Sequence, residues 1–353
     1  MNVEIWQQLL SLENRDITAQ WFSRIHSRDL NARRAKQINA AAKQAREYFR
    51  NSHNSSYSVR PLLTFYGVAS LSRALSLLLQ RNNGEEILNK GHGLETVDWN
   101  GVIVRENREG LDDAKRLKIR TCGGLFTDLL ASTENRTSMH IHSAAVDWRV
   151  MYDVPPLGSE LTLGDLLSRI PDLATDYALA SDDAQYVYVN ELSYHTDTGF
   201  SIKIAQDRFS KFSEVYLARG YTISTSAGFT TLIANAEISS SELPQFVHSY
   251  VNKMFSTIPM LHLSTPFPDG NRYSQLGITY MVSYILGMLV RYYPTQWMAL
   301  IQGEKGDIWW PTLNRAAHFV EQSYPELVME LITDKLAESD AQGVTGTGGD
   351  AHS

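Results

Sequence analysis

Two long segments, one near each end of the chain, carry apolar residues on nearly every face of a helix. The first covers 62–79, after Arg60 and Pro61, and the second covers 273–290, with no charged residue until Arg291. A helix that is apolar all round has to be covered by other elements. Pro61 suits a first helical turn, where its missing N–H costs nothing. We therefore predict two buried helices that pack against each other.

The second segment also has to be considered as a membrane span. Its length is only just sufficient to cross a bilayer, and Ser274, Gln275, Thr279 and Ser283 make it too polar for that role. We predict a helix buried within protein and no contact with a membrane.

Between these helices the pattern changes to short alternating runs. The alternation of side chains that is typical of a strand occurs over residues 186–189. It recurs at Phe200, Ile202 and Ile204, which are interleaved with polar residues. The pattern predicts two strands joined by a loop at 195–199. Further short strands are predicted over 101–104, 139–142, 221–225 and 229–234. Two helices interrupt the strands. One begins at Thr162, three residues before Asp165 in capping-box spacing, and the other begins near Ser241.

The pattern divides the chain into four regions. Residues 1–90 are predicted to be helical, 91–265 to form a β-containing lobe, and 266–338 to return to helix, with Pro311 and Pro325 each starting a helix. The glycine-rich residues 339–353 are predicted to be a disordered tail. The predicted fold class is a mostly helical α+β fold. Its N- and C-terminal helices pack together, with the β-containing lobe in the middle.

Composition excludes several classes of site. The net charge of −7 argues against a protein that coats nucleic acid, and the lone Cys122 excludes an intrachain disulfide and a multi-cysteine zinc site. His140 and His142 share one face of a predicted strand, but no third ligand lies at a diagnostic spacing. We find no phosphate loop, dinucleotide fingerprint or nucleophile elbow. We therefore expect a cytoplasmic protein with no metal and no cofactor.

The stretch from residue 24 to residue 60 is locally basic. Such a stretch is suited to contact with nucleic acid or with an acidic protein partner, although a solvated helix face has the same composition. The candidate contact residues are Arg33, Arg34, Lys36, Lys43 and Arg46.

Polar residues inside the apolar segments are candidates for ligand binding. Arg73 lies within the first apolar segment, where a buried guanidinium must be paired or must bind an anion, unless its face of the helix is open to solvent. His92 lies between two glycines, where the imidazole can serve as a base or as a ligand contact, or where the turn itself can be the purpose. Arg291 ends the second apolar segment and can be interpreted like Arg73. If a pocket exists, it should collect these three residues.

Several short segments resemble the YaaC-like family of bacterial proteins in sequence and in order. They are RPLLTFYG at 60–67, GHGL at 91–94, GGLF at 123–126, LTLGDLL at 161–167, IP at 170–171, RYYPTQW at 291–297 and PELV at 325–328. The resemblance implies a cytosolic bacterial protein without an assigned activity, so it carries over no catalytic residue. It groups Tyr66, His92, Arg291 and Trp297 in one pattern, which can equally specify the fold. We therefore add Tyr66 to the ligand-binding candidates.

These observations favour a binding or regulatory protein, or a subunit of a larger complex. The alternative is an enzyme directed at nucleic acid or nucleotides, such as an effector in antiviral defence, which the basic stretch and the isolated histidines motivate. Whether the protein is an enzyme, what its ligand is and how it oligomerises stay open at this stage.

Overall fold

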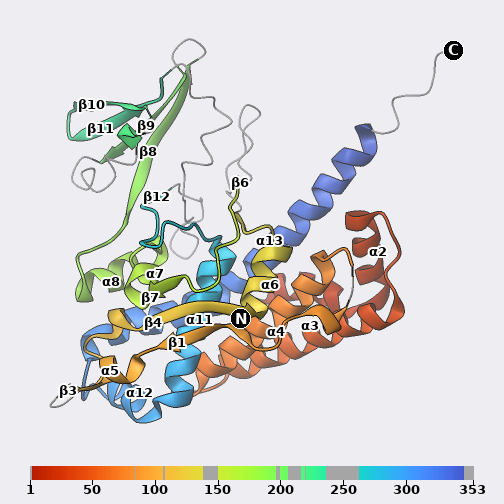
Figure 1. The fold of residues 1–353 in the computed structure, drawn as a ribbon, viewed down its shortest axis with the longest axis horizontal. Helices are drawn as coiled ribbons and strands as arrows, with labels where there is room; N and C mark the ends of the chain where they lie inside the picture. Colours follow the sequence, from red (N-terminus) through yellow and green to blue (C-terminus); the bar gives the residue numbers. More distant parts are fainter. Residues whose placement is uncertain are drawn as a thin grey trace.

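The computed structural model describes residues 2–82, 84–105, 108–137, 150–195, 199–205, 216–218, 220–235 and 262–345. Helices from both ends of the chain form its main body (Figure 1). The N-terminal set is α1 (Val3–Leu9), η1 (Leu10–Glu13), α2 (Arg15–His26), α3 (Ala32–His53), α4 (Arg60–Leu79) and η2 (Glu85–Ile87). The C-terminal set is α11 (Gln275–Tyr292), α12 (Pro294–Ile301), η7 (Asp307–Trp309) and α13 (Trp310–Thr345).

The two apolar helices, α4 and α11, pack against each other as predicted. Their contact is close at Gly287, where an added Cβ would lie 2.8 Å from the Cβ of Phe65. Helix α13 covers both, and Ser72 on α4 shares a 2.6 Å hydrogen bond with the hydroxyl of Tyr324. Helix α4 is long and apolar enough to cross a membrane, but 67% of its 18-residue apolar stretch is buried inside the protein. Burial of this kind is typical of a core helix.

A three-stranded antiparallel sheet lies on this helical body. It consists of β1 (His92–Val97), β4 (Lys118–Gly124) and β7 (Glu160–Thr162), in the order β1-β4-β7. One face sends Leu94, Ile119 and Leu161 into the main hydrophobic core. Short elements flank the sheet, and these are α5 (Trp99–Ile103), β2 (Val104–Arg105), β3 (Arg108–Glu109), η3 (Ala114–Arg116), α6 (Leu125–Ser132), β5 (Arg136–Thr137), β6 (Val150–Met151), α7 (Leu163–Leu167), η4 (Pro171–Leu173) and α8 (Ala174–Ala180).

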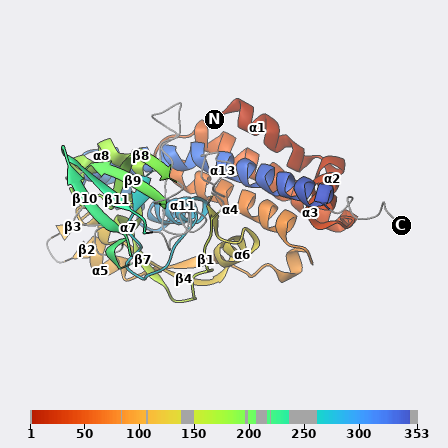
Figure 2. The ribbon, with the colours of Figure 1, turned by 90° about the horizontal axis from the view of Figure 1, so that it is seen from above.

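A second sheet forms the predicted lobe, which projects from the helical body in Figure 1. Its strands are β8 (Tyr186–His195), β9 (Gly199–Ala205), β10 (Thr222–Ser226), β11 (Phe229–Ile233) and β12 (His262–Ser264), in the order β10-β11-β9-β8-β12. The lobe has its own hydrophobic core, built around Phe200, Ile202 and Leu232. Figure 2 shows the sheet at one end of the molecule, beside α7 and α8. The mostly helical α+β class with a β-containing middle lobe is confirmed.

Several local predictions are also confirmed. The strands predicted over 200–204, 221–225 and 229–234 occur within one residue of their predicted bounds, and the strand predicted over 186–189 is the first part of β8, which continues to His195. Thr162 forms the predicted capping box with Asp165, each side chain bonding the other's backbone N–H. The strand predicted over 139–142 and the helix predicted from Ser241 lie outside the described residues.

Three local predictions are wrong. Residues 101–104 belong mostly to helix α5, because Trp99 and Ile103 are one helical turn apart and are both buried. Pro325 lies inside α13 instead of starting a helix. Proline inside a helix removes a hydrogen bond, and here Tyr324 and Val328, both fully buried, hold the helix on the core. Helix α13 also continues to Thr345, past the boundary predicted at 338.

Candidate functional site

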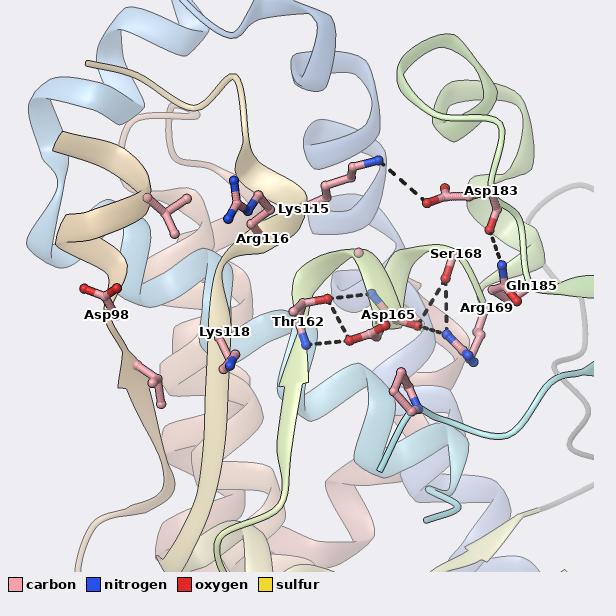
Figure 3. Close-up of a pocket in the computed structure, with 14 residues that line it drawn as sticks. Asp98, Lys115, Arg116, Lys118, Thr162, Asp165, Ser168, Arg169, Asp183 and Gln185 are labelled. Atoms are coloured by element: carbon pink, nitrogen blue, oxygen red, sulfur yellow. Dashed lines mark hydrogen bonds and ion pairs between the residues drawn. The ribbon is translucent and has the colours of Figure 1, made fainter. Parts of the chain in front are cut away.

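A groove of about 610 Å³ lies at one end of the three-stranded sheet (Figure 3). Its position follows from strand register, because Val97, Lys118 and Thr162 are paired across β1, β4 and β7 and all line the groove. The remaining lining residues come from α5 and the residue before it, η3, α7 and the two residues after it, the segment before β8, and Pro268. The site is therefore assembled from segments far apart in the sequence.

Three basic side chains, Lys115, Arg116 and Lys118, line the groove within four residues of each other. Lys115 Nζ donates to Ser181 Oγ at 3.3 Å and lies 3.7 Å from the carboxylate of Asp183. Arg116 lies 3.7 Å from Asp113, with about half of its side chain exposed. Both ion pairs, Lys115–Asp183 and Arg116–Asp113, are long at 3.7 Å, so both cations keep hydrogen-bonding capacity toward the groove.

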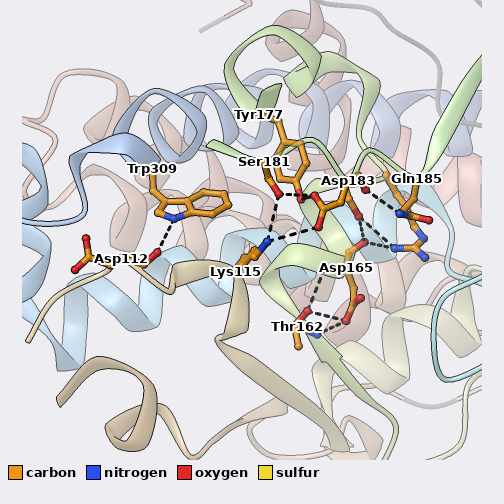
Figure 4. Close-up of polar contacts among 11 residues, drawn as sticks. Asp112, Lys115, Thr162, Asp165, Tyr177, Ser181, Asp183, Gln185 and Trp309 are labelled. Carbon is orange, nitrogen blue, oxygen red and sulfur yellow. Dashed lines mark hydrogen bonds and ion pairs between the residues drawn. The ribbon is translucent and has the colours of Figure 1, made fainter. Parts of the chain in front are cut away.

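Two acidic side chains of the groove, Asp165 and Asp183, are more fully occupied (Figure 4). Asp183 accepts from Tyr177 and from Ser181, both at 2.6 Å. Asp165 accepts the backbone N–H and the hydroxyl of Thr162 at 2.8 and 2.7 Å. Hydrogen bonds to the charged form stabilise a carboxylate, and they keep the pKa of Asp183 below its usual value although burial opposes this shift. These acids are therefore bound to internal donors.

Arg169 supplies a fourth positive charge beneath the groove. Its guanidinium donates to the carbonyl oxygens of Thr265, Asp165 and Pro266 at 2.8–3.0 Å. Burial lowers its pKa to about 10, and the carboxylate of Asp165 opposes that change. Arg169 thus ties the end of α7 to the segment that leads into α11.

A second basin of about 620 Å³ continues from the first, and the two share Lys118, Thr162, Asp165 and Pro268. Residues 156–162 form one side of this basin, and Pro268, Asp269 and Asn271 also line it. Lys118 pairs with Glu160 at 2.9 Å along β7. The two basins therefore form one continuous groove that passes the edge of the sheet.

Three of the four predicted ligand-binding residues come together elsewhere, between α4, β1 and α11. Arg291 Nη1 donates to the hydroxyl of Tyr66 at 3.2 Å, and the ring of His92 lies 4.9 Å from the ring of Phe65. Burial lowers the pKa of His92, and the nearby charge of Arg291 lowers it further. Both effects favour the neutral imidazole. Ligand binding by these three residues stays a prediction.

The glycines around His92 have a packing role. Gly93 has a φ of +79°, and an added Cβ would lie 2.6 Å from the backbone nitrogen of Phe126. The carbonyl of His92 accepts a 2.9 Å hydrogen bond from Tyr280 on α11. This turn therefore fixes the sheet to the helical body, as the structural interpretation of the motif requires.

Of the alternatives for Arg73, the structure shows the one in which its face of the helix is open to solvent. About 39% of its side chain is exposed, and its nearest carboxylate is that of Glu85 at 3.9 Å. Its neighbours on α4 are buried, so the face of α4 that carries Arg73 is the one open to solvent. A solvated, loosely paired arginine does not have to bind an anion.

The basic stretch separates into buried and exposed residues. Arg34 is only 3% exposed and donates through Nε to the carbonyl of Leu77 at 2.8 Å and through Nη2 to that of Gln80. It therefore caps the last turn of α4 and cannot reach a partner. Arg46 makes two hydrogen bonds to Glu13, at 2.6 and 3.1 Å. The exposed candidates that remain are Arg33, Lys36 and Lys43.

The groove was not predicted from the sequence, although the capped start of α7, which forms part of its lining, was predicted. The capping box at Thr162 was visible, and the alternation of Lys118 and Arg120 is a strand signal that places both cations on one face. The pairing of β4 with β7 was not visible from the sequence. Among the residues that the structure describes, no three His, Cys, Asp or Glu side chains are grouped to hold a metal ion.

Comparison with known proteins gives a family and no nearer relative. Searches of the curated proteins and of the solved structures each found no match. The family model described as YaaC-like Protein matches residues 10–332. That match covers most of the chain, including α4, the three-stranded sheet, the lobe and α11. The chain therefore belongs to the YaaC-like protein family.

Proposed function

We propose that this protein is a cytoplasmic binding protein that holds an anionic ligand, a carboxylate or a phosphate, in the groove beside β4. The observation that carries the proposal is the set of three cations, Lys115, Arg116 and Lys118, on one groove. Such a set is notable in a chain whose net charge is −7. Local potential, not net charge, decides which ligand a cleft attracts.

The contacts in the groove support a negatively charged ligand. Asp165 and Asp183 are already bonded to internal donors, whereas Lys115 and Arg116 have only long contacts to carboxylates. A hydrogen bond from a charged donor contributes about 1.5–3 kcal/mol. An anion that reaches two of these cations can therefore gain about 3–6 kcal/mol before the cost of association, which corresponds to weak or moderate affinity.

Isothermal titration calorimetry of the full chain with citrate and with inorganic pyrophosphate tests the proposal and separates carboxylate from phosphate. We expect at least one probe to bind, and Lys115→Ala to weaken it about tenfold, the equivalent of 1.4 kcal/mol. Lys36→Ala is the matched control, because Lys36 is an exposed lysine on α3, away from α7 in both ribbon views. Equal losses from the two variants would show non-specific attraction and refute the site.

A separate surface supports the idea of a complex subunit. Arg33, Lys36 and Lys43 are exposed on α3, and the nearest carboxylate to Arg33 is that of Glu86 at 3.7 Å. We propose that this face contacts an acidic protein partner. Its test is copurification with tagged full chain at low and high salt, where Lys36→Glu and Lys43→Glu should release partners that the unchanged protein retains. Recovery of nucleic acid instead would favour the alternative of an enzyme directed at nucleic acid.

A further inference from the structure

The edge of the three-stranded sheet borders the groove. Strand β7 is the outer strand in the order β1-β4-β7, so only one of its sides is paired. The second basin is lined by the whole of this strand, Glu160–Thr162, together with Gly158 and Ser159 before it. An unpaired strand edge beside a groove is the arrangement in which domains bind extended peptides by adding a strand.

The register shows which backbone groups of β7 face that edge. The N–H of Thr121 on β4 donates to the carbonyl of Ser159, and the N–H of Leu163 donates to the carbonyl of Leu117, the residue before β4. Because bonding alternates along an antiparallel strand, Leu161 also points its N–H and C=O toward β4, and Glu160 points its own away. Among the described residues, no group bonds to the backbone N–H or C=O of Glu160. The backbone N–H and C=O of Glu160 are therefore one donor and one acceptor that face the groove.

The two ends of this edge differ in character. At the Thr162 end, register brings in Lys118, and Lys115 and Arg116 follow from η3. At the other end, Leu157 lines the second basin with 61% of its surface exposed. Along the direction of β7 the groove thus passes from the exposed apolar side chain of Leu157, near Asp269 and Asn271, to the cations at the Thr162 end.

We propose that an extended peptide segment binds this groove as a fourth strand, antiparallel to β7. Its acidic residues lie toward its N-terminus, against Lys115 and Lys118, and its apolar residues lie toward its C-terminus, against Leu157. The occupant follows from charge complementarity and from the unpaired backbone of Glu160. The inference rests on the proposed anion-binding function and names its ligand class. Antiparallel pairing lets one peptide residue exchange both hydrogen bonds with Glu160.

A pair of substitutions at one position isolates the backbone contribution. Glu160→Ala removes the carboxylate and keeps the N–H, whereas Glu160→Pro also removes the N–H that faces the groove. Proline is tolerated at an edge strand where its nitrogen faces outward, so pairing with β4 should survive, which circular dichroism will check. We expect Glu160→Pro to bind the peptide at least tenfold more weakly than Glu160→Ala. Equal affinities in the two folded variants would overturn the strand addition.

The probe is a capped hexapeptide with two glutamates at its N-terminal end and two valines at its C-terminal end. Fluorescence anisotropy with the full chain should show it binding at least tenfold more tightly than the same composition in reversed order. N-methylation of the central peptide nitrogens should abolish binding, which keeps the test valid if Glu160→Pro does not fold. Citrate or pyrophosphate binding without peptide binding would overturn this inference alone. Failure of every probe would overturn the anion site as well.

Discussion

Arg34 provides the sharpest test of how this structure distributes its basic residues. Its guanidinium is buried, and it donates to the carbonyls of Leu77 and Gln80 at the C-terminal end of α4 while lying 4.8 Å over the ring of Phe22. The adjacent Arg33 has 77% of its side chain exposed. The two arginines are neighbours in sequence and opposite in role, so they form a matched pair.

The hydrogen bonds of Arg34 set the loss of stability expected when its side chain is truncated. Each hydrogen bond from a charged donor is worth about 1.5–3 kcal/mol, and truncation leaves two buried carbonyls without their donor. The cost of burying the charge, which also lowers the pKa of Arg34 to about 10, offsets part of this. We therefore expect Arg34→Ala to lower the free energy of unfolding by about 3–4 kcal/mol. Arg33→Ala should change it by less than about 0.5 kcal/mol.

Urea denaturation followed by circular dichroism at 222 nm measures both values. Arg34→Lys serves as the control for charge alone, because an ammonium cannot bridge two carbonyls with the geometry of a guanidinium. It should recover less than half of the lost stability. If Arg34→Ala were no more destabilising than Arg33→Ala, Arg34 would not cap α4. Arg34 would then again be a candidate residue for contact with a partner.

Three further predictions concern packing, pH and helix capping. Gly287→Ala should lower the free energy of unfolding by about 1–3 kcal/mol, because its new Cβ would meet Phe65, whereas Gly123→Ala, with nothing within 4 Å, should be nearly neutral in the same urea titration. Acidification from pH 7 to pH 5 should destabilise the protein, because the pKa of His92 is lowered in the folded state and the unfolded chain therefore takes up the proton first. In thermal melts, the His92→Asn variant should lose less stability over that interval than the unchanged protein. An equal loss in the two proteins would contradict the assignment. Thr162→Ala should cost about 0.5–2 kcal/mol by chemical denaturation, and Thr162→Ser should restore most of that stability.

Features set by local physics were predictable from the sequence. Pro61 marks the start of α4, and the spacing of Thr162 and Asp165 gives the capping box. The uncharged run before Arg291 predicts a helix that other elements must cover, and α4 and α13 cover it. Each of these depends only on residues within a few turns of one another.

Features set by facing partners were not predictable. Arg33 and Arg34 differ only in which side of α3 they occupy, and the position of α4 decides which one is buried. Arg73 lies in an apolar helix but on its solvent-facing side. The groove depends on the register of Lys118 with Thr162, a pairing across 44 positions that no local pattern encodes.

The separate core of the lobe has a thermodynamic consequence for the groove. A sheet that buries its own apolar residues can open as a cooperative unit with its own free energy, distinct from that of the helical body. Its edge strand β12 runs directly into the segment that Arg169 holds and that ends in Pro268 on the groove. Opening of the lobe would therefore loosen one wall of the groove. Ligand affinity and hydrogen exchange in the lobe would then be linked quantities, each measurable through the other.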